Sequence, residues 1–145
     1  MAEYRPLKVR ACDAEDVQIL AALFQDGLFR CQDLEFDAQA RTLTIRFNRF
    51  CHECEDAGQR VISALQVGQV LGLKSKGLVQ AKDTQGQNSF YMLLDMLLHT
   101  EGDDPELRLI CAEDVELRLK IEEIDIIACD LSPPWRTKRP PQHDE

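Results

Sequence analysis

The first apolar pattern in the chain has the spacing of a helix. Four apolar residues recur at positions i, i+3, i+4 and i+7 and would share one face: Val17, Leu20, Ala21 and Phe24. Asp13 precedes them and can cap the first turn, while Gly27 follows them and is free to adopt the left-handed conformation that ends many helices. The pattern therefore predicts one amphipathic helix over residues 14–26.

Most of the remaining chain has the features of half-buried strands, above all an alternation of apolar and polar residues. The expected strands cover residues 28–36, 42–48, 60–67, 70–76, 107–111, 115–121 and 124–128. The first two would form a hairpin through the turn at residues 37–41. The apolar phase shifts by one residue at Glu122-Glu123, so a bulge or a sharp bend is expected there.

Residues 90–98 are apolar at nearly every position, which fits either a strand buried on both faces or a helix. We favour a strand, because Asn88-Ser89 is only a fair helix cap. The elements together predict an α+β fold: about seven or eight antiparallel strands curled into a barrel or sandwich, with one N-terminal helix. A pleckstrin-homology-like barrel is one such arrangement. Residues 1–132 would form a single globular domain, and residues 133–145 a Pro-rich, basic tail.

Charge narrows the classes of partner. The 145-residue chain has a net charge of −9, most of it from residues 101–145, which hold 13 acidic and 6 basic residues. An anionic surface repels phosphate backbones and anionic lipids, so we expect neither a nucleic-acid nor a membrane partner. The N-terminus lacks an apolar signal-peptide core, and no stretch reaches the ~18 apolar residues that span a bilayer. We therefore expect a cytoplasmic protein whose cysteines are thiols.

Cys51-His52-Glu53-Cys54 is the sharpest local motif. Two cysteines at this spacing can bind one zinc ion, which needs four ligands in a structural site. No second pair with zinc-site spacing follows, so the other candidate ligands are scattered: His52, His99, Cys111 and Cys129. Two free thiols or a redox pair are the other interpretations, although no helix signal follows Cys54 to lower a thiol pKa. We expect no cofactor, with zinc at Cys51 and Cys54 as the alternative.

Catalytic patterns are not recognisable in this sequence. It contains no glycine-rich phosphate loop, dinucleotide-binding fingerprint, nucleophile elbow or metalloprotease motif. The acidic pairs Asp103-Asp104 and Glu122-Glu123 lack the spacing of a calcium loop. We therefore assign no catalytic residue and favour a protein that is not an enzyme.

Two basic stretches are candidates for a surface that contacts an anion or a partner. Lys74 and Lys76 lie two residues apart and would share one face of a strand. Trp135, Arg136 and Arg139 lie in the predicted tail. The chain has too few interleaved aromatic residues around these charges for a nucleic-acid footprint.

Several short motifs, taken in order, resemble one bacterial family. They are Asp13-Ala14-Glu15-Asp16 with Gln25-Asp26-Gly27, then Asn48-Arg49-Phe50, then Lys74-Ser75-Lys76-Gly77, then Asp130-Leu131 with Pro134-Trp135. The chain resembles the family known as domain of unknown function 2948, found mainly in alphaproteobacteria, from Leu7 to about His143. The resemblance implies a small intracellular protein with no assigned activity, cofactor or catalytic residue. Cys51-His52-Glu53-Cys54 departs from the family pattern after Asn-Arg-Phe.

These observations favour a non-catalytic protein-binding or regulatory module. Its partner would be another protein, bound through an exposed strand edge or the Trp135 tail, or a second copy bound through a sheet edge. The alternative is a small metal-binding protein or enzyme that uses Cys51 and Cys54.

Overall fold

The computed structural model describes residues 5–51, 58–78 and 90–136. In chain order the elements are β1 (Lys8–Ala11), α1 (Ala14–Phe24), β2 (Leu28–Arg30), a 3-10 turn (Cys31–Asp33), β3 (Leu34–Asp37), β4 (Thr42–Phe50), β5 (Gln59–Val67), β6 (Val70–Lys76), β7 (Phe90–His99), β8 (Glu106–Cys111), β9 (Glu116–Ile121), β10 (Ile126–Asp130) and β11 (Trp135–Arg136). None of the helical segments among these residues is long and apolar enough to cross a membrane.

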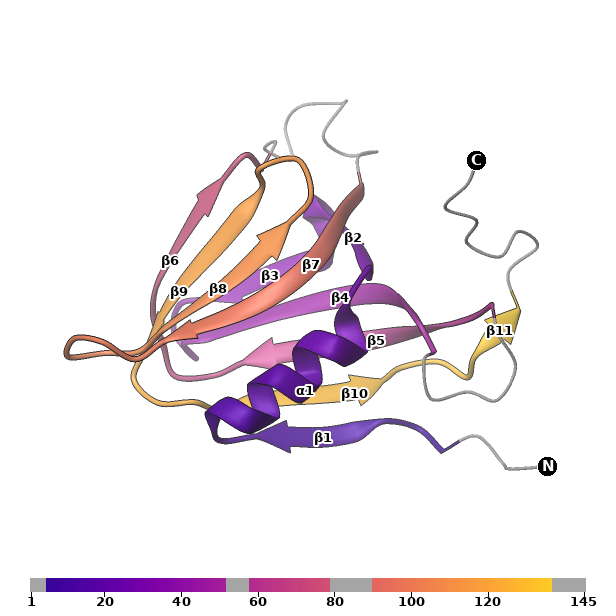
Figure 1. Cartoon of the computed structure of the whole chain (residues 1–145), viewed down its shortest axis with the longest axis horizontal. Coiled ribbons are helices and arrows are strands. Elements are labelled where there is room, and N and C mark those ends of the chain that lie inside the picture. Colours follow the sequence, from indigo (N-terminus) through magenta and orange to yellow (C-terminus); the bar gives the residue numbers. More distant parts are fainter. Residues whose placement is uncertain (1–4, 52–57, 79–89, 137–145) are drawn as a thin grey trace.

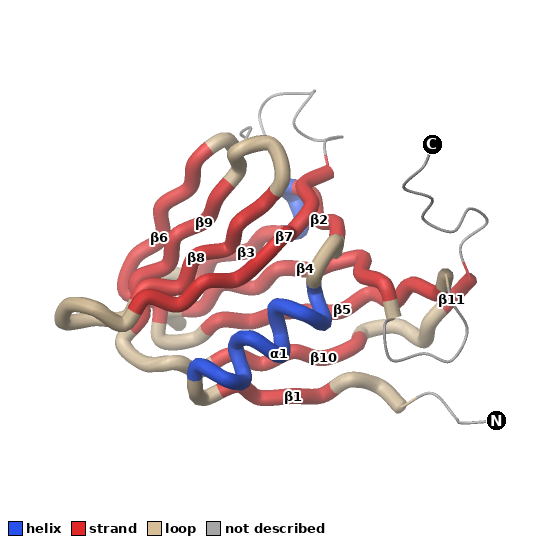
Figure 2. Tube along the Cα trace, in the orientation of Figure 1, coloured by secondary structure: helices blue, strands red, loops and turns tan. Residues whose placement is uncertain are grey.

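The strands form one antiparallel sheet that folds over on itself into two layers (Figure 1). The strand order is β1-β10-β5-β4-β2-β7-β8-β9-β6, with β3 also paired to β4 and β11 to β5. One layer contains β7, β8, β9 and β6, and the other contains β3, β4, β5, β10 and β1 (Figure 2). The order ends at β1 and β6 without closing, so the sandwich alternative is confirmed and the closed barrel is not formed.

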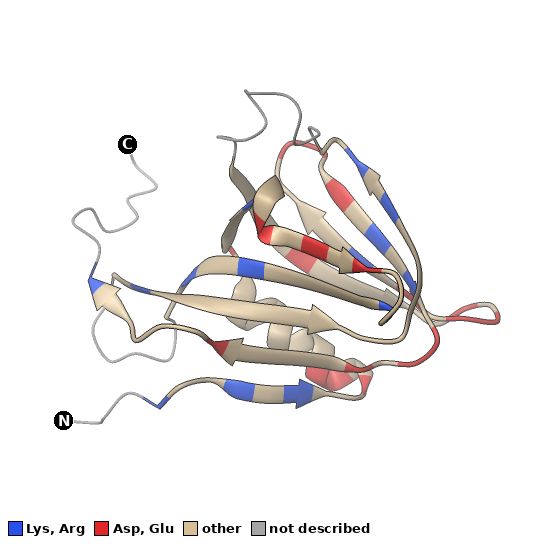
Figure 3. Ribbon diagram, turned by 180° about the vertical axis from the view of Figure 1, so that it is seen from behind, with Lys and Arg blue, Asp and Glu red and all other residues tan. Residues whose placement is uncertain are grey.

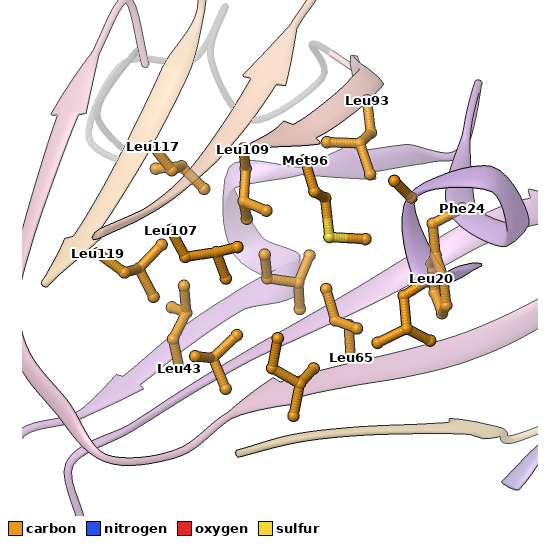
Figure 4. Close-up of a cluster of buried hydrophobic side chains, with 14 of the residues drawn as sticks. Leu20, Phe24, Leu43, Leu65, Leu93, Met96, Leu107, Leu109, Leu117 and Leu119 are labelled. Carbon is orange, nitrogen blue, oxygen red and sulfur yellow. The ribbon is translucent and has the colours of Figure 1, made fainter. Parts of the chain in front are cut away.

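The hydrophobic core lies between the two layers (Figure 4). Leu43 and Leu65 project into it from β4 and β5, and Leu107 and Leu119 face them from β8 and β9. All four side chains are buried. On each of these strands, every second side chain points into the core. The period-two pattern of the sequence therefore directs one face of each layer inward.

Helix α1 packs against β7, β4 and β1 and covers the core on that side (Figure 1). Asp13 caps it as predicted, since its Oδ1 accepts a hydrogen bond from Asp16 N at 2.8 Å. The end differs from the prediction, because the left-handed residue is Asp26 (φ 65°) and not Gly27. A Cβ at Gly27 would lie 2.9 Å from the carbonyl oxygen of Phe24, so this glycine permits a close backbone approach.

The other differences from the predicted elements lie in the strands. The expected strand 28–36 is broken by the 3-10 turn, so β2 pairs with β7 and with Asn48 of β4, while β3 forms the hairpin with β4. Strand β7 is a strand as expected, but it is not buried on both faces, because Leu94 and Leu97 are exposed. The phase shift after Ile121 is the crossing from β9 in one layer to β10 in the other.

Candidate functional site

Strand β6 lies at one end of the strand order. In the described part of the chain β9 is the only strand that pairs with it, in a register that includes Lys74 opposite Arg118 and Lys76 opposite Glu116. At the start of β6, Val70 N donates a hydrogen bond to the carbonyl oxygen of Arg41 at 2.9 Å. Beyond Val70, the other edge of β6 presents main-chain N–H and C=O groups that no described strand satisfies. Such an edge is a template for pairing with another chain.

Cationic side chains gather on the outer surface of β6, β9 and β8, which follow one another in the sheet. Lys74 on β6 lies opposite Arg118 on β9, which in turn lies opposite Arg108 on β8. These positions alternate with core residues of the same strands, so their side chains point away from the core. We call this surface the basic face and define it by five residues: Lys74, Lys76, Arg108, Arg118 and Lys120. Figure 3, viewed from behind, shows the Lys and Arg positions along these strands in blue.

Three carboxylates only partly neutralise the basic face. Arg108 contacts Glu106 at 2.7 Å, Arg118 contacts Glu116 at 3.3 Å, and Lys120 contacts Asp104 at 3.6 Å. The hydrogen bond donated by Arg108 lowers the pKa of Glu106, and the positive charge of Arg118 contributes in the same direction.

The two lysines on β6 remain available to a ligand. Both side chains are exposed, and neither forms an ion pair with any residue of the described segments. Five cations against three carboxylates leave the basic face with a net positive charge in a chain of net charge −9. This reversal of sign makes it a candidate surface for a negatively charged partner.

Two of the hollows on the described surface lie near β6 and β7. A hollow of about 200 Å³ is lined by Lys74, Ser75, Lys76, Glu116 and Arg118. It is below the size of typical small-molecule sites, roughly 300–1,000 Å³, and it fits a side chain better than a substrate. A hollow of about 490 Å³ is lined mainly by apolar side chains of β2, β7 and the β8–β9 turn. The titratable residues among its lining are Tyr91 and Glu113.

The sequence-predicted metal ligands are Cys51 and Cys54. Cys51 is buried and disulfide-bonded in the described structure. The expectation of thiols throughout therefore does not hold at Cys51. Cys54 lies outside the described residues, together with His52. Over residues 5–51, 58–78 and 90–136, no group of three or more His, Cys, Asp or Glu side chains is placed to hold a metal ion.

The second basic stretch lies far from the first. Trp135 and Arg136 form β11, which pairs with Arg60 and Gln59 at the start of β5. Strands β6 and β11 lie at opposite ends of the long axis of the molecule (Figure 1). Arg139 lies outside the described residues. Of the candidate residues that the structure describes, Lys74 and Lys76 therefore lie in β6 and Trp135 and Arg136 in β11, which pairs with β5.

A buried polar cluster centred on Arg49 is the feature that sequence reasoning missed. Arg49 donates hydrogen bonds to Ser63 Oγ at 2.7 Å and to Asp130 Oδ1 at 3.0 Å, and the Ser63 hydroxyl donates to the same carboxylate oxygen. Asp130 Oδ2 accepts a hydrogen bond from Leu7 N at 2.8 Å. The Arg49 guanidinium also lies 5.6 Å from the ring centre of Phe24 in α1. The cluster therefore joins β4, β5, β10, the helix and the segment before β1.

The position of Arg49 in its strand was the available signal. Residues 43, 45 and 47 of β4 face the core, and Arg49 continues the same phase. Ser63 and Asp130 likewise continue the core-facing phases of β5 and β10. A charged residue at a core-facing position requires a buried partner. Because the side chains of Arg49 and Asp130 are 0% and 1% exposed, no substrate can reach them, and their role is structural.

Comparisons with known proteins give a family but no activity. A crystal structure of an uncharacterized protein from Neisseria gonorrhoeae is similar over 83% of this chain and 96% of that one, with 13% sequence identity and a TM-score of 0.45. A search of curated proteins finds no match. The family of proteins of unknown function DUF2948 matches residues 7–143, and the chain belongs to this family.

Proposed function

We propose that the protein is a non-catalytic binding module that receives an extended segment of another protein at the open edge of β6. The observation that supports this most strongly is the position of β6, a seven-residue strand paired on one side alone among the described strands. A segment added to such an edge gains main-chain hydrogen bonds, and its alternate side chains determine specificity.

The other terminal strand, β1, is a poorer candidate. It has four residues, against seven in β6, and therefore offers fewer main-chain hydrogen bonds. The side chain of Arg10 in β1 already contacts Asp125 at 3.0 Å. The lysines of β6 form no such contact within the described part of the protein, which leaves them for a partner.

A binding role also agrees with the chemistry of the interior. The polar groups that do converge, around Arg49, are sealed beneath α1 and are fully engaged with one another. A catalytic set needs access to a substrate. Among the described residues, the β6 edge with its basic face is an accessible feature that could bind another molecule.

Site-specific photo-crosslinking in living cells tests the proposal. A benzoylphenylalanine at Leu71 of β6 is compared with one at Ile127 of β10, because both side chains are about equally exposed, at 44% and 40%. Strand β10 is paired on both sides, so Ile127 is the matched control. We expect one protein to be captured from Leu71 and not from Ile127, through a single mapped segment.

The mapped segment is then synthesised and added to the isolated protein. It should slow amide hydrogen exchange in β6 by about tenfold or more while leaving β1 unchanged, as expected for new main-chain hydrogen bonds. Equal capture from Leu71 and Ile127, or a segment that protects β1 or α1 instead of β6, would refute the proposal.

A further inference from the structure

We infer that the segment received by β6 is acidic, with carboxylate side chains at alternate positions that face the basic face. This inference rests on the proposed strand addition at β6 and specifies the chemistry of the partner. It follows from the geometry of the edge, from the arrangement of charges behind it, and from the charge of the other edges of the same molecule.

The geometry fixes the spacing of the charges. Lys74 and Lys76 lie two residues apart on the outer face of β6. In an added strand, the residues opposite them are also two apart and point to the same face, at Cβ separations of about 5 Å. A partner segment with acidic residues at positions i and i+2 therefore meets both lysines at once. The hollow lined by Lys74, Ser75, Lys76, Glu116 and Arg118 lies beside the two lysines, with three cations against one carboxylate.

The arrangement of charges favours an anion over a neutral segment. Like charges directly opposite each other in a sheet are destabilising, yet Lys74, Arg118 and Arg108 follow one another across three strands. Glu106 and Glu116 form ion pairs with the two arginines, whereas no described carboxylate forms an ion pair with Lys74. A carboxylate from a partner would complete this row.

The charges also disfavour pairing of β6 with β6 or β1 of a second copy of the same chain. Pairing two β6 strands would bring lysines against lysines, and pairing β6 with β1 would bring them against Lys8 and Arg10. Strand β3 is acidic at alternate positions, Glu35 and Asp37, but has four residues. The occupant that fits β6 is therefore an acidic segment of a different protein, and β3 of a second copy becomes an outcome of the test.

Designed peptides test the inference without knowledge of the natural partner. The probe is a nine-residue peptide, blocked at both ends, that alternates Glu with Thr and Val; in the control peptide Gln replaces every Glu. Affinity is measured by NMR titration of the full chain at low ionic strength. We expect the Glu peptide to bind about tenfold more tightly than the Gln peptide, the sum of a few exposed ion pairs, and to lose that advantage at 0.5 M salt.

Two variants of equal charge change locate the effect. Lys74→Gln/Lys76→Gln should abolish the preference for Glu, whereas Lys8→Gln/Arg10→Gln on β1 should leave it unchanged. Equal binding of the Glu and Gln peptides, with both protecting β6 amides, would overturn the acidic partner and leave strand addition intact. Binding of neither peptide at β6 up to millimolar concentration would overturn both. Concentration-dependent self-association that is lost in Glu35→Gln/Asp37→Asn would overturn the assignment to a different protein.

Discussion

Replacing Asp130 by alanine should be among the most damaging single changes in this protein. The substitution takes from the Arg49 guanidinium the carboxylate that lies 3.0 Å away, and it removes the acceptor for the Ser63 hydroxyl and for Leu7 N–H. Arg49 would remain in a site where its side chain is 0% exposed. Removing one partner of a buried ion pair costs about 3–5 kcal/mol. That is about a fifth or more of the ~5–15 kcal/mol stability of an ordinary domain.

Equilibrium unfolding in urea, followed by far-ultraviolet circular dichroism, measures the cost. With a denaturant dependence of about 2 kcal/mol per molar, the midpoint should fall by about 2 M. Arg10→Ala is the control, because it breaks the Arg10–Asp125 pair, in which the Arg10 side chain is 65% exposed. Such a surface pair contributes about 0–1 kcal/mol, so the midpoint of this variant should shift by less than about 0.5 M.

Two further variants separate charge from shape. Asp130→Asn keeps the size of the side chain and should remain folded if Asp130→Ala does not, with an intermediate loss. In Arg49→Met/Asp130→Leu both charges are absent, so the double variant should lose less stability than the sum of Arg49→Met and Asp130→Leu. Additive losses, or an Asp130→Ala midpoint equal to that of Arg10→Ala, would refute the conclusion that this pair is a sealed, coupled unit.

Two other predictions concern the core and the end of the helix. Burial raises the pKa of the Cys111 thiol to about 11, so the folded chain holds this proton more tightly than the unfolded chain. The stabilising effect of this proton is present below pH ~9 and is lost as the pH rises towards 11. The stability difference between wild type and Cys111→Ala should therefore fall by about 2–3 kcal/mol between pH 8.5 and 11. A constant stability difference over this range would contradict the raised pKa of Cys111. Gly27→Ala should cost about 1–3 kcal/mol in urea unfolding because its Cβ would meet the Phe24 carbonyl oxygen and the Phe47 ring at 2.9 and 3.2 Å. Gly72→Ala, with no atom within 4 Å of its Cβ, should be nearly neutral; equal effects at the two glycines would show that crowding is not the cause.

Local patterns predicted the elements but not their partners. The period-two alternation identified most strands, and Asp13 marked the start of the helix, because both depend on neighbours in the chain. Strands β5 and β6 are separated by Gly68-Gln69 and suggest a hairpin, yet β6 pairs with β9, about 45 residues further on. Strand order depends on which apolar faces meet in the core, and this information is spread over the whole chain.

The same limit explains the outcome for the candidate site. Lys74 and Lys76 were predicted to share a face of a strand, and they do, but Arg108 and Arg118 join them only through strand pairing. The position of Trp135 also depends on strand pairing, since β11 adds to β5. The Arg49 cluster could have been inferred in part, because its three charged or hydroxyl side chains occupy core-facing phases of their strands.

The central claim is that an acidic segment adds to β6 as a further strand. Intermolecular nuclear Overhauser effects between the main chain of the alternating Glu peptide and that of the protein test it most directly. The account predicts short main-chain contacts to residues of β6, at the alternating spacing of an added strand, and none to β1. Contacts confined to β1, to α1 or to the larger hollow near Tyr91, with none along β6, would contradict it.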